Sequence, residues 1–218
     1  MQNRRKNLPS LTFFISLVCC TVSYGKGELT LSKLLYINAC VRDDSRTAEL
    51  TKTYLEGFSG EMEEVRLESL PLAPLKSKSL EMQNAFAQNK QWDDPMFLLA
   101  KQFRECEQLL VSAPYWHLSF PALLRTYFEN VCVCGLTFRY SPEGRPLSLC
   151  RLNKLTYITT SGGIIGEYNF GFNYLKALCG CFYGVKDFEF FSAEGLDIKE
   201  NDAGTILEEA KKKIRKRG

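Results

Sequence analysis

The chain has 218 residues, of which 45% are hydrophobic and 24% are charged, and this composition is typical of a globular protein with a full hydrophobic core. The net charge is +3, and the positive charges gather at the two ends of the chain. Residues 1–30 carry a net charge of +3 and the last eight residues, KKKIRKRG, carry six positive charges, so the stretch between them is acidic. The acidic stretch between them excludes an extended basic surface, so no nucleic-acid partner is expected.

The first thirty residues form a predicted N-terminal extension, separate from a folded domain at residues 31–218. Residues 8–24 are an apolar run behind three basic residues, which has the shape of a signal peptide and is short for a membrane span. If the gene is bacterial, we favour another interpretation, in which translation starts just after this extension. Residues 25–28, GKGE, require purine-rich codons that resemble a ribosome-binding site, and Leu31 is then a TTG start codon. An exported or anchored form is the alternative to a cytoplasmic protein without a stable membrane partner.

From Lys33 onward, short apolar runs alternate with amphipathic patterns. The runs predict strands at 33–39, 62–70, 107–114, 154–160 and 186–195. The amphipathic patterns predict helices at 45–58, 95–106, 121–133, 168–184 and 200–216. Pro95 suits a first helical turn, and Asp202 is a candidate cap. Residues 71–94 are predicted to be an excursion with at most a short helix.

This alternation predicts an α/β fold with a parallel sheet covered on both faces. Right-handed crossovers then give a doubly wound three-layer sandwich, with five strands in the order 2-1-3-4-5. Such sheets bind ligands beyond the carboxyl ends of their strands, where the strand order switches. The loops expected to meet there are ACVRDDSRT, APYWHLSFP and TSGGIIGEYNF.

The nine cysteines and the single histidine, His117, make a metal site improbable. The pairs Cys132/Cys134 and Cys179/Cys181 lie in helix-like segments, where residues two apart point to different faces. We expect most of these thiols to be reduced core residues, which favours a cytoplasmic setting.

The first of the three loops predicts an anion site. Ser45, Arg46 and Thr47 place two hydroxyl groups and a guanidinium group at a helix N-terminus, where free backbone N–H groups favour a phosphate. The alternative is that Ser45 only caps the helix. No GxxxxGKS or GxGxxG motif is present, so a nucleoside triphosphate or dinucleotide is not indicated.

The other two loops add an aromatic pair and a glycine pair. Tyr115 and Trp116 could cover a planar ring by stacking, or alternatively fill the core or a dimer contact. Gly162 and Gly163, after Ser161, allow close approach of a ligand to the backbone, or form a plain turn. A phosphate, a flat ring and a close backbone together describe a mononucleotide, and FMN fits best.

Four motifs carry a resemblance to a known family: KLLYINACVRDDSRTAEL, SAPYWHLSFPALLRTYFENVCVCGLTFRYSPEGRPL, YITTSGGI and FFSAEGLDI. From Lys33 to about Ile198 the chain resembles the FMN-dependent NADH:quinone oxidoreductases and azoreductases of the flavodoxin-like fold. The resemblance implies that the FMN site consists of Cys40, Ser45, Arg46 and Thr47 around the phosphate, Pro114, Tyr115, Trp116, His117 and Leu118 beside the isoalloxazine, and Thr160, Ser161, Gly162 and Gly163 on its other side.

The chain departs from that family at two places. It has Tyr-Trp-His-Leu where the azoreductases commonly have Met-Tyr-Asn-Phe, and Thr-Ser-Gly-Gly where they have Ser-Arg-Gly-Gly. Cofactor binding through backbone groups should survive both changes, so the departures concern substrate preference. His117 is expected at the polar edge of the flavin, where it could stabilise charge on the reduced ring. The alternative is an imidazole that donates to a loop carbonyl.

The resemblance also implies an activity. NADH or NADPH would give a hydride to FMN and leave, and a quinone or azo acceptor would replace it in a ping-pong cycle. It implies a homodimer with the flavin sites near the interface, where YNFGFNYL could contribute to the interface or line the acceptor pocket. A flavodoxin-type electron carrier and a non-catalytic flavin-binding regulatory protein are the alternatives.

Overall fold

The computed structural model describes residues 32–217. The predicted N-terminal extension and the start at Leu31 therefore lie outside the described residues. Among the helices of residues 32–217, none combines the length and the apolar character that a membrane span requires.

The centre of the fold is a sheet of five parallel strands. These are β1 (Lys33–Asn38), β2 (Glu61–Arg66), β3 (Gln108–Ser112), β6 (Lys154–Thr160) and β7 (Asp187–Ala193). They lie in the order β2-β1-β3-β6-β7. If only the strands of this sheet are counted along the chain, the order is 2-1-3-4-5, as predicted. The labels β6 and β7 stand for the fourth and fifth of these strands because two short strands, absent from the prediction, lie between β3 and β6.

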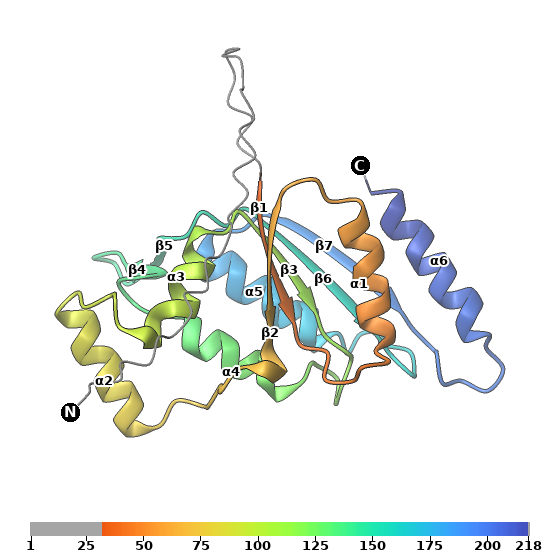
Figure 1. Cartoon of the computed structure of the whole chain (residues 1–218), viewed down its shortest axis with the longest axis horizontal. Coiled ribbons are helices and arrows are strands. Elements are labelled where there is room, and N and C mark those ends of the chain that lie inside the picture. The colour runs from red at the N-terminus through yellow and green to blue at the C-terminus, as the bar shows by residue number, and fades with distance from the viewer. Residues whose placement is uncertain (1–31, 218) are drawn as a thin grey trace, which may run out of the picture. The chain divides into compact units, whose positions relative to one another are not determined.

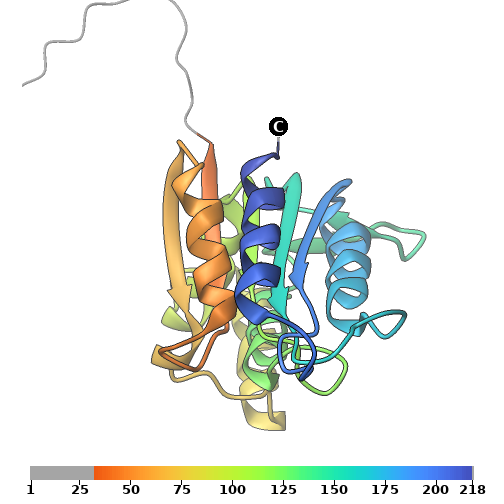
Figure 2. The ribbon, with the colours of Figure 1, turned by 90° about the vertical axis from the view of Figure 1, so that its right-hand side faces the viewer.

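Helices cover both faces of this sheet (Figures 1 and 2). One layer contains α1 (Arg46–Glu56) and α6 (Ala203–Arg215), and the other contains α3 (Leu98–Glu105), α4 (Ala122–Val131) and α5 (Phe170–Tyr183). Successive side chains of a strand point to opposite faces. Leu34 and Tyr36 therefore pack in the core under α1 and α6, while Leu35 and Ile37 pack in the core under α3, α4 and α5. A strand buried on both faces therefore appears in the sequence as a continuous apolar run.

The helix boundaries follow the predicted capping residues. The Ser45 hydroxyl accepts a hydrogen bond from the N–H of Ala48 at 3.3 Å, and the Asp202 carboxylate accepts from Thr205 at 2.6 Å. Pro95 opens a 3₁₀ turn, η2 (Pro95–Phe97), that leads into α3. Both predicted caps and the role of Pro95 in the first turn are confirmed.

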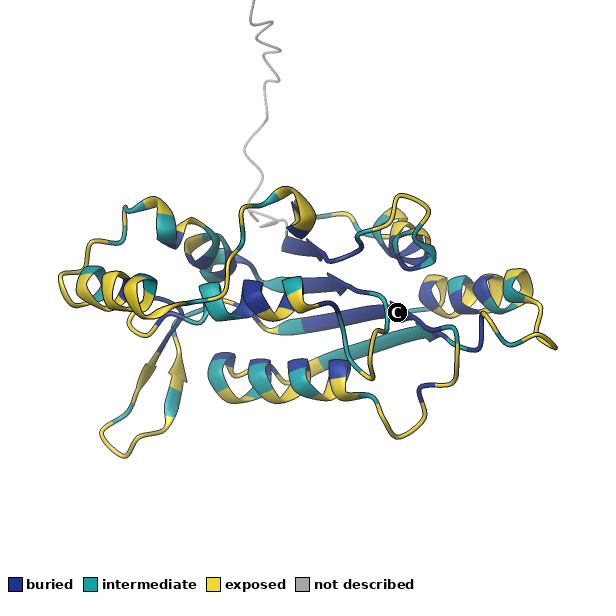
Figure 3. Ribbon diagram, turned by 90° about the horizontal axis from the view of Figure 1, so that it is seen from below, coloured by how far each residue is buried: buried dark blue, intermediate teal, exposed yellow. Residues whose placement is uncertain are grey.

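Three elements differ from the prediction. The excursion contains a full helix, α2 (Ser77–Gln88), in which Gln83 is the one buried residue. The predicted second strand ends at Arg66, and a 3₁₀ turn, η1 (Leu67–Ser69), follows it. An unpredicted antiparallel hairpin, β4 (Phe138–Tyr140) with β5 (Pro146–Ser148), projects as a largely exposed arm (Figure 3).

The seven cysteines that the structure describes are all free thiols. Cys40, Cys106 and Cys179 are buried, Cys132 and Cys150 are half-buried, and Cys134 and Cys181 are exposed. The prediction that most thiols belong to the core therefore holds for only part of this set. The Cys132/Cys134 pair also lies outside a helix, because Cys132 caps the end of α4.

Thiol reactivity should follow burial. Desolvation raises the pKa of Cys106 to about 12, so its thiolate fraction at pH 8 falls about a thousandfold relative to a thiol of pKa about 9. Iodoacetamide at pH 8 should therefore label the exposed Cys134 and Cys181 first, and Cys106 only after denaturation. Peptide mass spectrometry over time measures the order. Equal labelling of Cys106 and Cys134 in the native protein would contradict it.

Candidate active site

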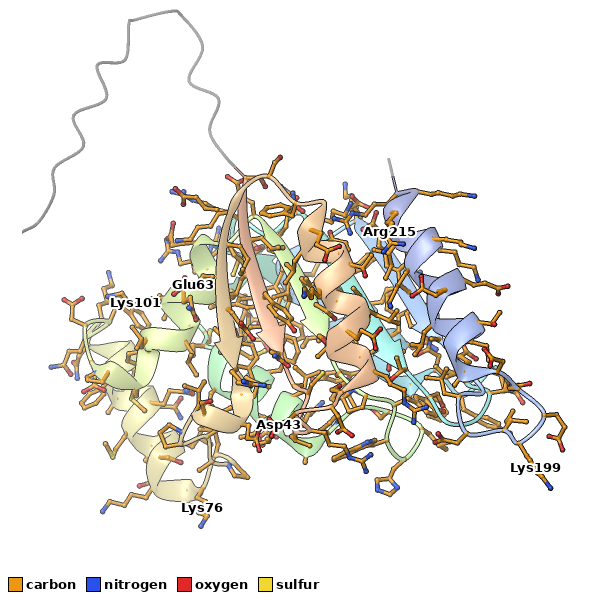
Figure 4. The ribbon with its side chains drawn as sticks, turned by 45° about the vertical axis from the view of Figure 1, so that its right-hand side comes forward. Asp43, Glu63, Lys76, Lys101, Lys199 and Arg215 are labelled. Carbon is orange, nitrogen blue, oxygen red and sulfur yellow. The ribbon has the colours of Figure 1, made fainter. Side chains whose placement is uncertain are left out.

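A pocket of about 270 Å³ lies at the carboxyl ends of the parallel strands. It is lined by Val41, Arg42, Asp44, Ser45, Arg46, Thr47, Pro114, Tyr115, Trp116, Thr160, Ser161, Gly162, Leu196 and Asp197. These residues come from the loops after β1, β3, β6 and β7, which meet because parallel strands end at the same edge. Asp43 and Lys199 lie in two of these loops and are labelled near the lower edge of the molecule in Figure 4.

Most of the predicted site residues are brought together here. Ser45, Arg46, Thr47, Pro114, Tyr115, Trp116, Thr160, Ser161 and Gly162 line the pocket, whereas Cys40, His117, Leu118 and Gly163 do not. Five further residues that line the pocket were not predicted as site residues: Val41, Arg42, Asp44, Leu196 and Asp197. The last two belong to the motif FFSAEGLDI, whose loop follows β7 and was not among the three loops selected.

The α1 side of the pocket is rich in hydrogen-bonding groups. Ser45 caps α1, so the proposed capping role is confirmed, and the first N–H groups of the helix have no acceptor within it. The Thr47 and Thr160 hydroxyl oxygens are 2.6 Å apart, and both residues are buried. A helix N-terminus with adjacent hydroxyl groups is suited to a phosphate.

Arg46 has a partner that the sequence did not indicate. Its Nη2 atom lies 2.8 Å from Oδ1 of Asp197, and its Nη1 atom donates to the carbonyl of Leu196 at 3.4 Å. The guanidinium group therefore connects the start of α1 to the loop after β7.

The loops after β6 and β7 are joined by backbone hydrogen bonds. Leu196 donates to the carbonyl of Ser161 at 3.1 Å, and Asp197 donates to the carbonyl of Gly162 at 2.9 Å. A Cβ atom on Gly162 would overlap Oδ2 of Asp197, whereas a Cβ atom on Gly163 would meet nothing within 4 Å. A side chain at Gly162 would therefore displace the Asp197 carboxylate, whereas one at Gly163 would displace nothing.

The two glycines should respond differently to alanine. Gly162→Ala should lower the free energy of unfolding by about 1–3 kcal/mol, because the added methyl group must displace the Asp197 carboxylate. Gly163→Ala is the matched control, and it should be neutral or stabilising by up to about 1 kcal/mol. Urea denaturation of both variants measures the difference. Equal stabilities would mean that Asp197 is not held against Gly162.

Tyr115 and Trp116, here called the aromatic wall, are held by backbone contacts. The Tyr115 N–H donates to the Thr160 carbonyl at 3.0 Å, and its hydroxyl donates to the Tyr168 carbonyl at 3.0 Å. Trp116 and Ser119 exchange two backbone hydrogen bonds, of 2.9 and 2.8 Å. The loop after β3 therefore holds the aromatic wall at the pocket, with the Trp116 side chain partly exposed.

The turn closed by Trp116 and Ser119 has an unusual pair of central residues. His117 and Leu118 have φ values of 49° and 66°, a left-handed conformation that usually requires Asn or Gly. Both side chains are exposed at its tip and lie outside the pocket. Within residues 32–217, the His117 ring makes no hydrogen bond to a loop carbonyl, and its expected place at the polar edge of a flavin stays a prediction.

Cys40 lies beneath the first loop. It is buried, and its sulfur is 3.3 Å from the Ser112 hydroxyl oxygen. Burial raises the pKa of this thiol, so it remains protonated near neutral pH. In the part of the chain that the structure describes, no group of three His, Cys, Asp or Glu side chains is arranged to hold a metal ion.

Comparison with known proteins agrees with this architecture. Residues 32–217 match the model of a protein family whose description is flavodoxin-like fold. The chain is 32% identical over 189 residues to FMN-dependent NADH:quinone oxidoreductase 2 of Clostridium acetobutylicum, and the match covers 81% of this chain and 93% of the relative. It is 31% identical over 189 residues to the FMN-dependent NADH:quinone oxidoreductase of Clostridium beijerinckii, with coverage of 83% and 94%.

Solved structures show the same fold. The crystal structure of an azoreductase from Bacillus anthracis aligns with a TM-score of 0.72 at 24% identity, covering 86% of this chain and 100% of that chain. Together with the sequence relatives, this agreement confirms the resemblance carried by the four motifs. The chain belongs to the flavodoxin-like family that includes the FMN-dependent NADH:quinone oxidoreductases.

Proposed function

We propose that the chain is an FMN-dependent NAD(P)H:quinone oxidoreductase that also reduces azo compounds. One observation supports this most. The N-terminus of α1, a glycine-containing loop and the aromatic wall line the same pocket at the carboxyl edge of the sheet. The names of the relatives, which specify NADH, FMN and quinone, support the same activity.

The residues of the pocket fit FMN. The N–H groups at the start of α1, with the hydroxyl groups of Ser45 and Thr47, would hold the phosphate, because these donors lie together at the helix N-terminus. The aromatic wall would cover one part of the isoalloxazine, and Thr160, Ser161 and Gly162 would approach it with backbone groups. The family assignment of Cys40, His117, Leu118 and Gly163 to this site remains part of the proposal, with His117 and Leu118 acting through their backbone N–H groups.

FMN supplies hydride acceptance and donation when it is bound. The protein's part is to bind and orient: the α1 N-terminus neutralises phosphate charge, and the aromatic wall excludes water from the ring plane. We assign no protein acid or base, because the hydride chemistry belongs to the cofactor. Because donor and acceptor would occupy the same exposed face in turn, ping-pong kinetics are expected.

Absorbance spectra and steady-state turnover test the proposal. The purified protein, incubated with FMN and desalted, should show flavin absorbance and should oxidise NADH with menadione or benzoquinone as the acceptor. An electron carrier would need a protein partner for turnover, and a regulatory flavoprotein would bind FMN without it. Absence of flavin absorbance after incubation would reject the enzyme, the electron carrier and the regulatory flavoprotein alike.

The proposal includes a cytoplasmic homodimer and a start at Leu31. Exposed apolar side chains of Ile164, Tyr168 and Phe170 lie on the segment that Tyr115 contacts, and a second copy could cover them beside the pocket. Light scattering after size-exclusion chromatography tests the dimer, and a monomer at micromolar concentration would oppose it. The intact mass of the native protein tests the start.

His117→Leu should leave the hydride step unchanged. Since the ring is exposed and outside the pocket, stopped-flow reduction by NADH and FMN affinity should stay within about twofold of wild type. Leucine is less tolerant of a left-handed φ, so stability should fall by up to about 1 kcal/mol, and His117→Asn should restore it. A flavin-edge role would instead slow reduction by up to about two or three decades.

A further inference from the structure

Asp197 occupies a defined place in the pocket. Its backbone N–H is bonded to the Gly162 carbonyl, its carboxylate lies where a Gly162 side chain would be, and Arg46 holds one carboxylate oxygen at 2.8 Å. Contacts with Gly162 in the loop after β6 and with Arg46 at the start of α1 therefore hold a negative charge at the α1 side of the pocket.

This placement has consequences for an anionic ligand. The N–H groups of α1 favour one phosphate at the helix N-terminus. Arg46 is half-exposed, and its charge is partly offset by Asp197, whose side chain is 65% exposed. A second phosphate attached to the first would add negative charge to the pocket that Asp197 lines, and the carboxylate would repel it.

We propose that Asp197 is a specificity-determining residue that restricts the site to flavins ending in a single phosphate. The inference rests on the proposed FMN-binding function and adds a residue-level reason for its selectivity. FMN ends at the phosphate that the α1 N-terminus receives. FAD continues through a second phosphate to adenosine, and the fixed carboxylate opposes that continuation.

Titration of the full-length apoprotein with riboflavin, FMN and FAD, followed by flavin fluorescence, tests the proposal. Asp197→Asn keeps the size of the side chain and removes the charge. The ratio of the FAD to the FMN dissociation constant should fall at least tenfold in this variant. Riboflavin affinity should stay within about twofold, because riboflavin carries no phosphate, and this value also shows that the pocket is folded.

Two further variants separate the local charge from other causes. Asp43→Asn removes the same charge from the loop after β1, at an exposed residue that does not line the pocket, and it should leave the ratio within about twofold. Arg46→Gln removes the cation and leaves the carboxylate, so FMN binding should weaken while the ratio stays at or above the wild-type value. Sodium chloride at 1 M should reduce the effect of Asp197→Asn, since exposed charges are screened.

The outcomes distinguish this inference from the proposed function. A wild-type ratio in Asp197→Asn, or an equal fall in Asp43→Asn, would overturn the role of Asp197 while leaving FMN binding intact. A fall of the ratio in Arg46→Gln would assign selectivity to the bridge itself and overturn the role of the carboxylate. If the wild-type protein binds no flavin, the proposed function and this inference both fail.

Discussion

Thr47→Val should weaken FMN binding by about one to two decades. The substitution removes a hydroxyl group that we place on the phosphate, and a hydrogen bond to a charged group contributes about 1.5–3 kcal/mol. The Thr47 oxygen is 2.6 Å from that of Thr160, so the variant also leaves a buried hydroxyl without this partner. Titration of the apoprotein with FMN measures the first effect, and urea denaturation measures the second.

Thr53→Val is the matched control for this experiment. Thr53 is a buried threonine of the same helix, and it does not line the pocket. FMN affinity should be unchanged in this variant. Riboflavin should bind Thr47→Val as it binds the wild type, because the lost contact is to phosphate. An unchanged FMN dissociation constant in Thr47→Val would mean that the phosphate lies elsewhere.

Phe103→Ala should lower the free energy of unfolding by about 3–5 kcal/mol, the usual cost of removing a buried phenyl ring. Phe103 has no exposed surface, and its ring centre lies 4.8 Å from that of Tyr183 and 6.3 Å from that of Phe128. One side chain of α3 thus packs against α4 and α5. A cavity here removes contacts from the whole layer.

Denaturation in urea measures this cost, with a lower midpoint and an unchanged slope. Leu98→Ala is the control on the same helix, and since Leu98 is 68% exposed, its effect should stay within about 0.5 kcal/mol. A loss below 1 kcal/mol in Phe103→Ala would show that the layer closes around the cavity.

The sheet and the helix caps were predictable from local patterns. The residues of β1, KLLYIN, form a mostly apolar run that is buried on both faces, and such a run marks a central strand. Ser45 and Asp202 bond to N–H groups three residues away, which makes a cap readable from a few neighbouring residues. The alternation of these elements then determined the edge at which ligands bind.

The short hairpin and the long excursion were not predictable in the same way. Each strand of the β4–β5 hairpin has three residues, too few for a period-two pattern, and the hairpin lies beside α5. In α2, Gln83 is the one buried residue, so no apolar stripe marks the helix. Both elements depend on contacts with distant parts of the chain.

By itself, the sequence determined the strand and helix pattern, the pocket edge and most residues that line it. Tertiary structure alone decided that Asp197 meets Arg46 and that a side chain at Gly162, rather than at Gly163, would meet Asp197. It also decided that His117 is exposed and does not line the pocket. Arg46 and Asp197 are 151 residues apart, and their contact depends on how the loops after β1 and β7 converge. Local periodicity reports which face of an element is buried, whereas a contact between loops depends on the packing of the whole sheet.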